Sequence, residues 1–178
     1  MFIRNIIYKI RGEVPTSILV KRGLKIGKNF QRMSHVIIDD SHCWLIEIGD
    51  NVTLAPRVHI LAHDASTKMF IGYTKIGCVI IENNVFIGAD CIILPGVRIG
   101  SNVVIGSGSI VTTDLESNYV YAGNPCQKID TIENFISKHK KNINEKSVFG
   151  EEYILKNINQ IKKEEMKKLI RENGGYIV

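Results

Sequence analysis

An aliphatic residue returns at every sixth position through the middle of the chain. The unbroken series is Ile81, Ile87, Ile93, Ile99, Ile105 and Val111. A helix repeats its apolar positions every 3.6 residues and a strand at every second residue, so a period of six fits neither element. The residues two places before each member are small or β-branched as well: Val79, Val85, Cys91, Val97, Val103 and Ser109. Each six-residue unit therefore carries two candidate inward side chains.

A second column of residues marks where the chain changes direction. Three places after each aliphatic residue stand Asn84, Asp90, Gly96, Asn102, Gly108 and Asp114. Because Gly, Asn and Asp tolerate a positive φ, a left-handed turn residue is expected once in every six residues. Short strands separated by such corners predict a parallel β-helix in which three strands make one triangular coil of about 18 residues. The alternative, a β-sandwich, requires hairpin turns at uneven spacing and longer alternating strands.

The same phase continues upstream at Ile48, Leu54 and Ile60. Val20 and Ile26 predict an earlier and weaker coil with Asn29 at its corner. Ile60 and Ile81 are 21 residues apart, which is not a multiple of six, so the chain leaves the coil between them. We expect an excursion loop of about a dozen residues there, and long loops on regular scaffolds often carry function. His63 opens this loop.

The two ends differ from the repeats. Residues 1–19 have apolar residues at helical spacing, which predicts a short N-terminal helix that caps the first coil, with membrane contact as the alternative. Residues 20–129 are expected to form the β-helix domain. Residues 130–178 are rich in Lys and Glu, and their helical spacing predicts solvated helices appended to the coil. The expected fold class is therefore an all-β core with a helix before it and helices after it.

Composition narrows the classes of function. The chain has 23 basic and 18 acidic residues, a net charge of +5, and its basic excess lies near the two ends. A nucleic-acid-binding face is therefore not supported. No stretch reaches the roughly 20 apolar residues that span a bilayer, and the N-terminus lacks a continuous apolar signal segment, so a cytoplasmic protein without a transmembrane segment is expected. The four cysteines have no C-x-x-C spacing and fit reduced thiols.

The run GADCIILPGVRIGSNVVIGSGSIVTTDLESNYVYAGNPCQKI resembles the hexapeptide-repeat O-acetyltransferases, and YAGNPCQKI is its most specific part. The resemblance covers residues 20–130 and is to the branch of the maltose acetyltransferases and the enzymes that acetylate bacterial surface polysaccharides. It implies a left-handed β-helix, a homotrimer with active sites between subunits, and acetyl-coenzyme A as donor. The acceptor that it implies is a carbohydrate hydroxyl, such as a bacterial capsule or O-antigen sugar or its precursor.

The resemblance also places a catalytic histidine at the mouth of the excursion loop, where His63 stands. His63 lies three places after Ile60, at a corner from which a side chain can project into a cleft. Transfer of acetyl from a thioester to a hydroxyl needs a base that takes the hydroxyl proton. An imidazole, whose ordinary pKa is about 6.5, suits that task at neutral pH. We predict direct transfer with His63 as general base, without an acetyl-enzyme and without a metal.

Further residues align with donor and acceptor contacts of the family. Those expected to line the coenzyme A site are Phe86, Ala89, Ser107, Thr112, Thr113 and Lys128, with Lys128 as a partner for the phosphates. Small side chains suit a long thin pantetheine arm, although small residues also suit plain turns. Those expected at the acceptor are Asp39, Asp40 and Ser34, with His35 as a weaker candidate. Trp44 either stacks on a pyranose ring or closes a coil end.

Other functions remain open at this point. The chain could be a non-catalytic trimeric scaffold, or its acceptor could be a small non-sugar molecule such as an amino acid or an antibiotic. A third alternative is a zinc-dependent hydratase, with zinc held across a subunit interface by His59 and His63, and with His35 as a candidate third ligand. Zinc sites require three or four well-placed ligands. Binding of acetyl-coenzyme A and the metal content distinguish these alternatives.

Overall fold

The computed structural model describes residues 12–178, so most of the expected N-terminal helix lies outside the described residues. The chain forms two compact units, which divide after Ile132. The first unit contains the repeats and the second contains residues 133–178.

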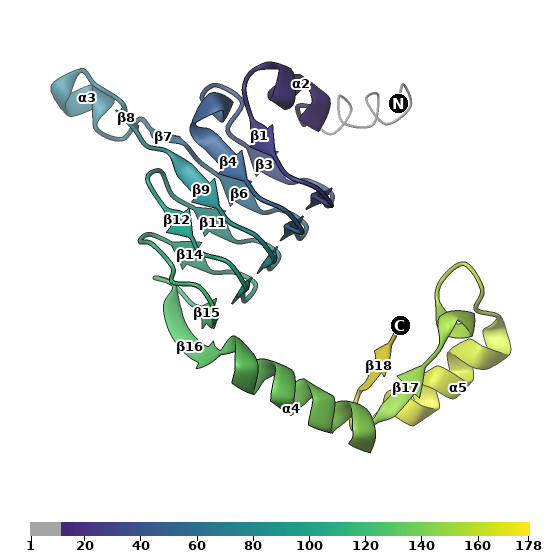
Figure 1. Cartoon of the computed structure of the whole chain (residues 1–178). Helices are drawn as coiled ribbons and strands as arrows, with labels where there is room; N and C mark the ends of the chain where they lie inside the picture. The colour runs from purple at the N-terminus through teal and green to yellow at the C-terminus, as the bar shows by residue number, and fades with distance from the viewer. Residues whose placement is uncertain (1–11) are drawn as a thin grey trace. The chain divides into compact units, whose positions relative to one another are not determined.

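The first unit stacks its strands into three sheets (Figure 1). In stacking order the first sheet holds β1 (Lys25–Ile26), β4 (Ile46–Ile48), β9 (Val79–Ile81) and β12 (Arg98–Ile99). The second holds β2 (Gln31–Arg32), β5 (Thr53–Leu54), β10 (Val85–Ile87), β13 (Val103–Ile105), β15 (Tyr119–Ala122) and β16 (Gln127–Thr131). The third holds β3 (Ile37–Ile38), β6 (His59–Ile60), β11 (Ile92–Ile93) and β14 (Ile110–Val111).

From β1 to β6 and again from β9 to β14, consecutive strands lie in the three sheets in turn, so each passage through them is one coil of a parallel β-helix. For example, β9, β10 and β11 belong to the three sheets in turn, and β12 returns to the sheet of β9. Neighbouring strands are parallel throughout these sheets except that β16 runs antiparallel to β15. The expected parallel β core is therefore confirmed.

The register shows where the repeat is interrupted. Paired residues of β10 and β13 are 18 apart in the sequence, as in Val85 with Val103. Those of β3 and β6 are 22 apart, as in Ile38 with Ile60. Those of β4 and β9 are 33 apart, as in Ile48 with Ile81. Relative to 18 residues, the chain inserts four residues in its first coil and 15 in its second. The first insertion contains the short 3-10 helix η1 (Cys43–Leu45). The second is the expected excursion loop.

The core contains the two columns that the period predicts. All twelve of their side chains, from Val79 to Val111, are at most 2% exposed. The expectation of a coil strand at Val20 was wrong, because Val20 lies in helix α2 (Thr16–Lys21) and is 42% exposed. Leu19 of that helix and Leu24 are buried in the core instead. The described helix that covers the first coil, α2, therefore extends further along the sequence than the expected helix of residues 1–19.

One corner of the coils carries a continuous row of asparagines. Asn29, Asn51, Asn84, Asn102 and Asn118 all have φ between 54° and 70°. Each of the first four donates from its Nδ2 to the Oδ1 of the next at 2.9–3.0 Å. We call this row the asparagine ladder.

Asp114 departs from the expected corner geometry, because it is not among the described residues with positive φ. Its Oδ1 instead accepts a hydrogen bond from the backbone N–H of Arg98 at 2.8 Å. Asp114 therefore serves as a side-chain acceptor for the neighbouring coil.

The excursion loop is a hairpin with a helical tip. Strands β7 (His63–Asp64) and β8 (Lys75–Ile76) pair antiparallel, and the helix α3 (Lys68–Ile71) lies between them and projects away from the coils (Figure 1). The tip exposes the apolar side chains of Met69, Phe70, Ile71 and Tyr73. His63 therefore lies at the base of the loop, where the chain leaves the coil.

The second unit contains helices α4 (Ile132–Glu145, whose first residue closes the first unit) and α5 (Gln160–Ile170), as well as the short η2 (Glu151–Tyr153). It also has a parallel pair of strands that the sequence analysis did not expect, β17 (Ser147–Phe149) and β18 (Gly175–Ile177). In the described part of the chain, no helix has both the length and the apolar character needed to cross a membrane.

Candidate functional site

Asp39 is a buried carboxylate that immediately follows β3. Its Oδ1 accepts hydrogen bonds from the backbone N–H groups of Ser41 and His42, both at 3.1 Å. Its Oδ2 accepts from the backbone N–H of Ala62 at 3.0 Å and is hydrogen-bonded to Nδ1 of His63. The side chain is 1% exposed, so these four contacts replace the water that would otherwise solvate the charge.

His63 lies on the next coil, where the pairing of Ile38 with Ile60 brings the segment after β6 beside Asp39. Since Asp39 accepts hydrogen bonds when ionised, Nδ1 of His63 carries the proton and Nε2 carries a free lone pair in the neutral ring. The His63 side chain is 34% exposed. The arrangement therefore presents a basic nitrogen on an imidazole whose orientation is fixed by a carboxylate.

The electrostatics favour an ionised Asp39. Burial by itself raises the pKa of this carboxyl, but the hydrogen bond from His63 and those from the amides of Ala62 and His42 outweigh it and lower the pKa below its ordinary value. A charged Asp39 stabilises the imidazolium that His63 becomes when it accepts a proton. The pair is thus suited to general-base chemistry.

His42 is a third member of this cluster, and the sequence analysis missed it. It precedes η1, and its ring centroid lies 4.9 Å from that of His63 and 5.3 Å from that of Trp44. Its Nδ1 is buried, lies 3.9 Å from Oδ1 of Asp39, and has no hydrogen-bond partner among the described residues. The sequence does contain a sign of this insertion. Ile38 and Ile48 are 10 residues apart where the repeat has six, so four residues are added to the coil.

Asp39, His42 and His63 are also the group in the described chain that could hold a metal ion, since their ligand atoms lie within 4.8 Å of one another. The hydratase alternative named a different set, and the structure does not bring that set together. His35 and His59 line a separate hollow with Arg57 and Asp90, at the start of β3 and β6 rather than at their ends. Within one chain His35 and His59 therefore do not meet His63, and a zinc site made of these three residues would need a second subunit.

The three expected acceptor residues occupy different surroundings. Asp39 lies beneath His63, with both oxygens engaged as described above. Asp40 is exposed and forms an ion pair with Arg22, with Oδ2 and Nη1 3.4 Å apart. Ser34 lies at the opposite end of β3 from Asp39. Of these three residues, Asp39 is the one that the structure places in contact with His63 in the same chain.

Five of the six expected donor residues lie in three places. Ala89 and Ser107 stack on neighbouring coils ahead of β11 and β14, where a Cβ on Gly88 would lie 2.5 Å from the backbone nitrogen of Ser107. Thr112 and Thr113 are exposed and follow β14, so they lie at the other end of the third sheet. Phe86 is exposed on β10 between Thr53 and Val104. One chain therefore does not gather these residues around His63.

Lys128, the expected phosphate partner, already has two neighbours. Its Nζ lies 2.9 Å from Oε2 of Glu116 and 3.6 Å from the ring centroid of Tyr119. The hydrogen bond to Glu116 raises the pKa of Lys128. The amine is thus charged and positioned on the outer face of β16.

The buried cysteines are poorly suited to carry an acetyl group. Cys91 and Cys126 are buried, and burial raises the pKa of both thiols. Because the thiolate is the nucleophilic form, this environment suppresses their reactivity. Cys78 is free and exposed.

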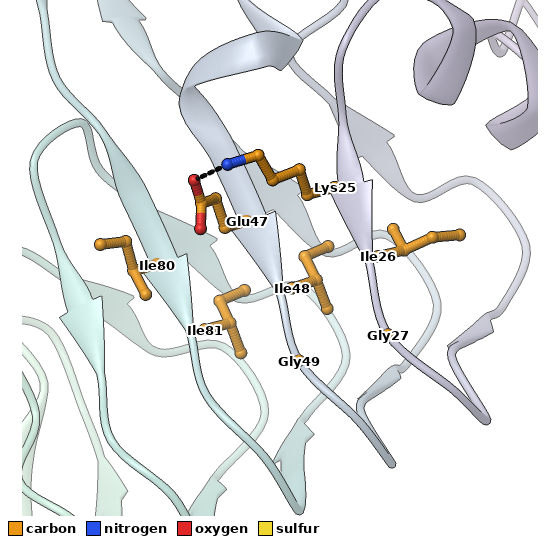
Figure 2. Close-up of a pocket in the computed structure, with 8 residues that line it drawn as sticks. All are labelled: Lys25, Ile26, Gly27, Glu47, Ile48, Gly49, Ile80 and Ile81. Carbon is orange, nitrogen blue, oxygen red and sulfur yellow. Dashed lines mark hydrogen bonds and ion pairs between the residues drawn. The ribbon is translucent and has the colours of Figure 1, made fainter.

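A further hollow lies on the first sheet, as Figure 2 shows. It crosses β1, β4 and β9, and the ion pair between Nζ of Lys25 and Oε1 of Glu47 spans it at 2.6 Å. None of the eight lining residues belongs to the histidine cluster or to the expected donor and acceptor residues.

Comparison with known proteins adds independent information. Residues 78–113 match the family described as bacterial transferase hexapeptide (six repeats). The chain is 39% identical over 145 residues to protein CapG of Staphylococcus aureus, which covers 72% of this chain and 83% of CapG. It is 40% identical over 129 residues to galactoside O-acetyltransferase of Escherichia coli strain K12, which covers 67% of this chain and 60% of that protein. The chain thus spans less than two thirds of the length of this second relative.

The structure is similar to that of a galactoside acetyltransferase in complex with coenzyme A. The TM-score is 0.56 at 28% sequence identity, and the match covers 75% of this chain and 80% of the other.

Proposed function

Since the chain belongs to the family of hexapeptide-repeat transferases, we propose that it transfers acetyl from acetyl-coenzyme A to a hydroxyl of a carbohydrate acceptor. The observation that carries this proposal is the hydrogen bond between Asp39 and Nδ1 of His63 at the base of the excursion loop. A bacterial capsule or O-antigen sugar, or its precursor, is the acceptor that we favour. The names of the relatives support a sugar, because one is a galactoside O-acetyltransferase.

In the proposed mechanism His63 acts as the general base. Nε2 of His63 takes the proton of the acceptor hydroxyl as its oxygen attacks the thioester carbonyl carbon. The tetrahedral intermediate then collapses, the carbon–sulfur bond breaks, and the imidazolium returns the proton to the coenzyme A sulfur. Asp39 keeps the ring oriented and stabilises its positive charge between these two steps. A backbone N–H is the proposed donor to the oxyanion.

We propose further that the active protein is a homotrimer of left-handed β-helices with triangular coils, and that its active sites lie between subunits. The scatter of Ala89, Ser107 and Thr112 over two ends of one sheet supports this assembly, because a second chain could bring donor residues to His63. The exposed apolar tip of the excursion loop supports it as well, since monomers rarely leave such side chains in water. Phe86, Thr113 and Lys128 remain proposed donor contacts, and Ser34 and Asp40 remain proposed acceptor contacts.

The test is thiol release from acetyl-coenzyme A with a panel of mono-, oligo- and polysaccharides, compared between the parent and His63→Ala. We expect acceptor-dependent release that falls by about 10²- to 10⁴-fold in the variant, which is the usual effect of losing a general base. His59→Ala is the matched control, because His59 lies outside the cluster. Absence of release with any acceptor, together with absence of acetyl-coenzyme A binding, would instead support the scaffold.

A further inference from the structure

The proposed function leaves Trp44 unused, although its side chain lies close to the catalytic histidine. Trp44 belongs to η1, within the four-residue insertion, and is 53% exposed. Tryptophan offers a large flat apolar face and an N–H group, so an exposed indole beside the candidate site suits contact with a ligand.

Trp44 is held at its base by a close contact with Gly23. A Cβ at Gly23 would lie 2.8 Å from Cβ of Trp44, and Gly23 has φ of +110°, so only glycine fits there. The backbone of one coil thus packs directly against the start of the Trp44 side chain. The indole is anchored where it meets the chain and remains exposed beyond that point.

Three rings lie in a row from the surface to the proposed base. The Trp44 ring contacts the His42 ring, and the His42 ring contacts the His63 ring. Trp44 is therefore one ring removed from His63. A sugar ring stacked on Trp44 would therefore be a neighbour of the sugar whose hydroxyl reacts at His63. It would not itself carry the reacting hydroxyl.

Two charged side chains lie on segments next to the base of Trp44, since Arg22 precedes Gly23, which packs against Cβ of Trp44. Nη1 of Arg22 lies 3.4 Å from Oδ2 of Asp40 and 3.3 Å from the carbonyl oxygen of Asp40. Both side chains are about half exposed, so their remaining donors and acceptors are open to a ligand. An exposed aromatic face with a few charged groups nearby suits a saccharide, which offers apolar C–H faces and hydroxyl edges.

We propose that Trp44 is a stacking platform for a sugar ring adjacent to the one that is acetylated. The acceptor is then a glycoside or an oligosaccharide of at least two rings, and the Arg22–Asp40 pair binds hydroxyls at its edge. This inference rests on the proposed function, whose acceptor class it narrows. In this proposal Asp40 contacts the acceptor, because it binds a hydroxyl of the sugar ring that stacks on Trp44.

Trp44 is the only tryptophan of the chain, so intrinsic fluorescence reports on this platform alone. We would titrate the parent protein with methyl β-galactoside, maltose, maltotetraose and chitotetraose. We expect a saturable change of tryptophan emission with at least one of the two-ring or longer saccharides, at lower concentrations than with the one-ring glycoside. Unchanged emission with all of them would overturn the platform.

Kinetics of variants provide the second readout. We expect Trp44→Ala to raise KM for the oligosaccharide acceptor by about tenfold or more, a loss typical of one stacking contact. KM for acetyl-coenzyme A should stay as in the parent, and Trp44→Phe should restore most of the affinity. If Trp44→Ala leaves the oligosaccharide KM unchanged while the parent is active, the platform is wrong and the proposed function stands. If the parent acetylates no saccharide, the proposed function fails, and the emission titration still decides whether the platform binds sugars.

Discussion

Asp39 and His63 are hydrogen-bonded to each other although 24 residues separate them in the sequence. The contact follows from the register of the coils, which pairs Ile38 with Ile60 and so brings the residues after both strands together. The neighbouring coil also supplies the backbone N–H of Ala62 to the same carboxylate. The strand pairing of the coils therefore sets the geometry of the proposed base, His63.

Replacing Asp39 by Asn should impair catalysis more than binding. The amide cannot stabilise the imidazolium, and it can hold the ring in the wrong tautomer, which in a serine protease triad lowers kcat by about 10⁴-fold. We expect a fall in kcat of about 10²- to 10⁴-fold with KM for acetyl-coenzyme A nearly unchanged. Steady-state kinetics check this. Equal rates for Asp39→Asn and the parent would remove Asp39 from the mechanism.

The same substitution should change how stability depends on pH. The pKa of Asp39 is lowered in the folded protein, below its ordinary value of 3.8. The ionised carboxylate therefore contributes stability that is fully present above about pH 4 and is lost as the pH falls through the folded value. The gap in unfolding free energy between parent and Asp39→Asn should be widest at neutral pH and should narrow below pH 4. Denaturant titrations at several pH values measure it, and a gap that widens in acid would contradict the assignment.

The coils were predictable from sequence because their pattern is local and strict. Two buried side chains and one turn residue recur every six residues, and the columns from Val79 to Val111 pack as expected. The failure at Val20 has a physical reason, because two apolar residues six places apart are too few to distinguish a coil strand from a short helix. Leu19 and Leu24 fill the core from a helix where the period expected a strand.

The site was less predictable because it lies where the pattern is broken. His63 was identified through the loop that interrupts the repeat, but the role of Asp39 depends on a register of 22 residues rather than 18. That offset comes from four added residues, which also introduce His42 and Trp44. The six-residue period does not extend into this insertion, so it cannot predict which residues lie next to His42 and Trp44.

The asparagine ladder should contribute measurably to stability. In Asn84→Ala the chain loses two side-chain hydrogen bonds, to Asn51 and Asn102, and must place alanine at φ of 59°. We expect a loss of about 1–3 kcal/mol, since a left-handed alanine alone costs about 1–2 kcal/mol. Asn84→Gly is the matched control, because glycine accepts this φ and removes only the amide. Equal melting temperatures for the two variants would show that the backbone conformation is not the main cause.

Removal of metal ions should leave the activity intact. The oxygens of Asp39 already accept hydrogen bonds from three backbone N–H groups and contact His63, and a metal ion would have to displace some of them. We expect dialysis against a chelator to leave thiol release unchanged and the purified protein to contain less than about a tenth of an equivalent of zinc, far below the whole ion of a resident site. Loss of activity on chelation and recovery with zinc would make Asp39, His42 and His63 a metal centre.

No cysteine should carry the acetyl group during turnover. Burial raises the pKa of Cys91 and Cys126, so their thiols remain protonated and weakly nucleophilic. Mass spectrometry of the protein after mixing with acetyl-coenzyme A alone should show no acetylated cysteine, and Cys78→Ser should retain full activity. A stable acetyl thioester that forms and then decays on addition of acceptor would establish a two-step route.

Stacked coils have no inherent length, because each coil offers its backbone N–H and C=O groups to a next one. Growth along that axis would join separate molecules into a fibre. In the second sheet the chain prevents this by reversing after β15, so that β16 covers the last parallel strand in the opposite direction. A parallel strand of a second molecule cannot pair with β15 on this side, because β16 is already paired with it. The register of that pairing shifts between Val120 and Tyr121. In the second sheet, the reversal of β16 thus covers the last parallel strand and keeps it from pairing with a strand of another molecule.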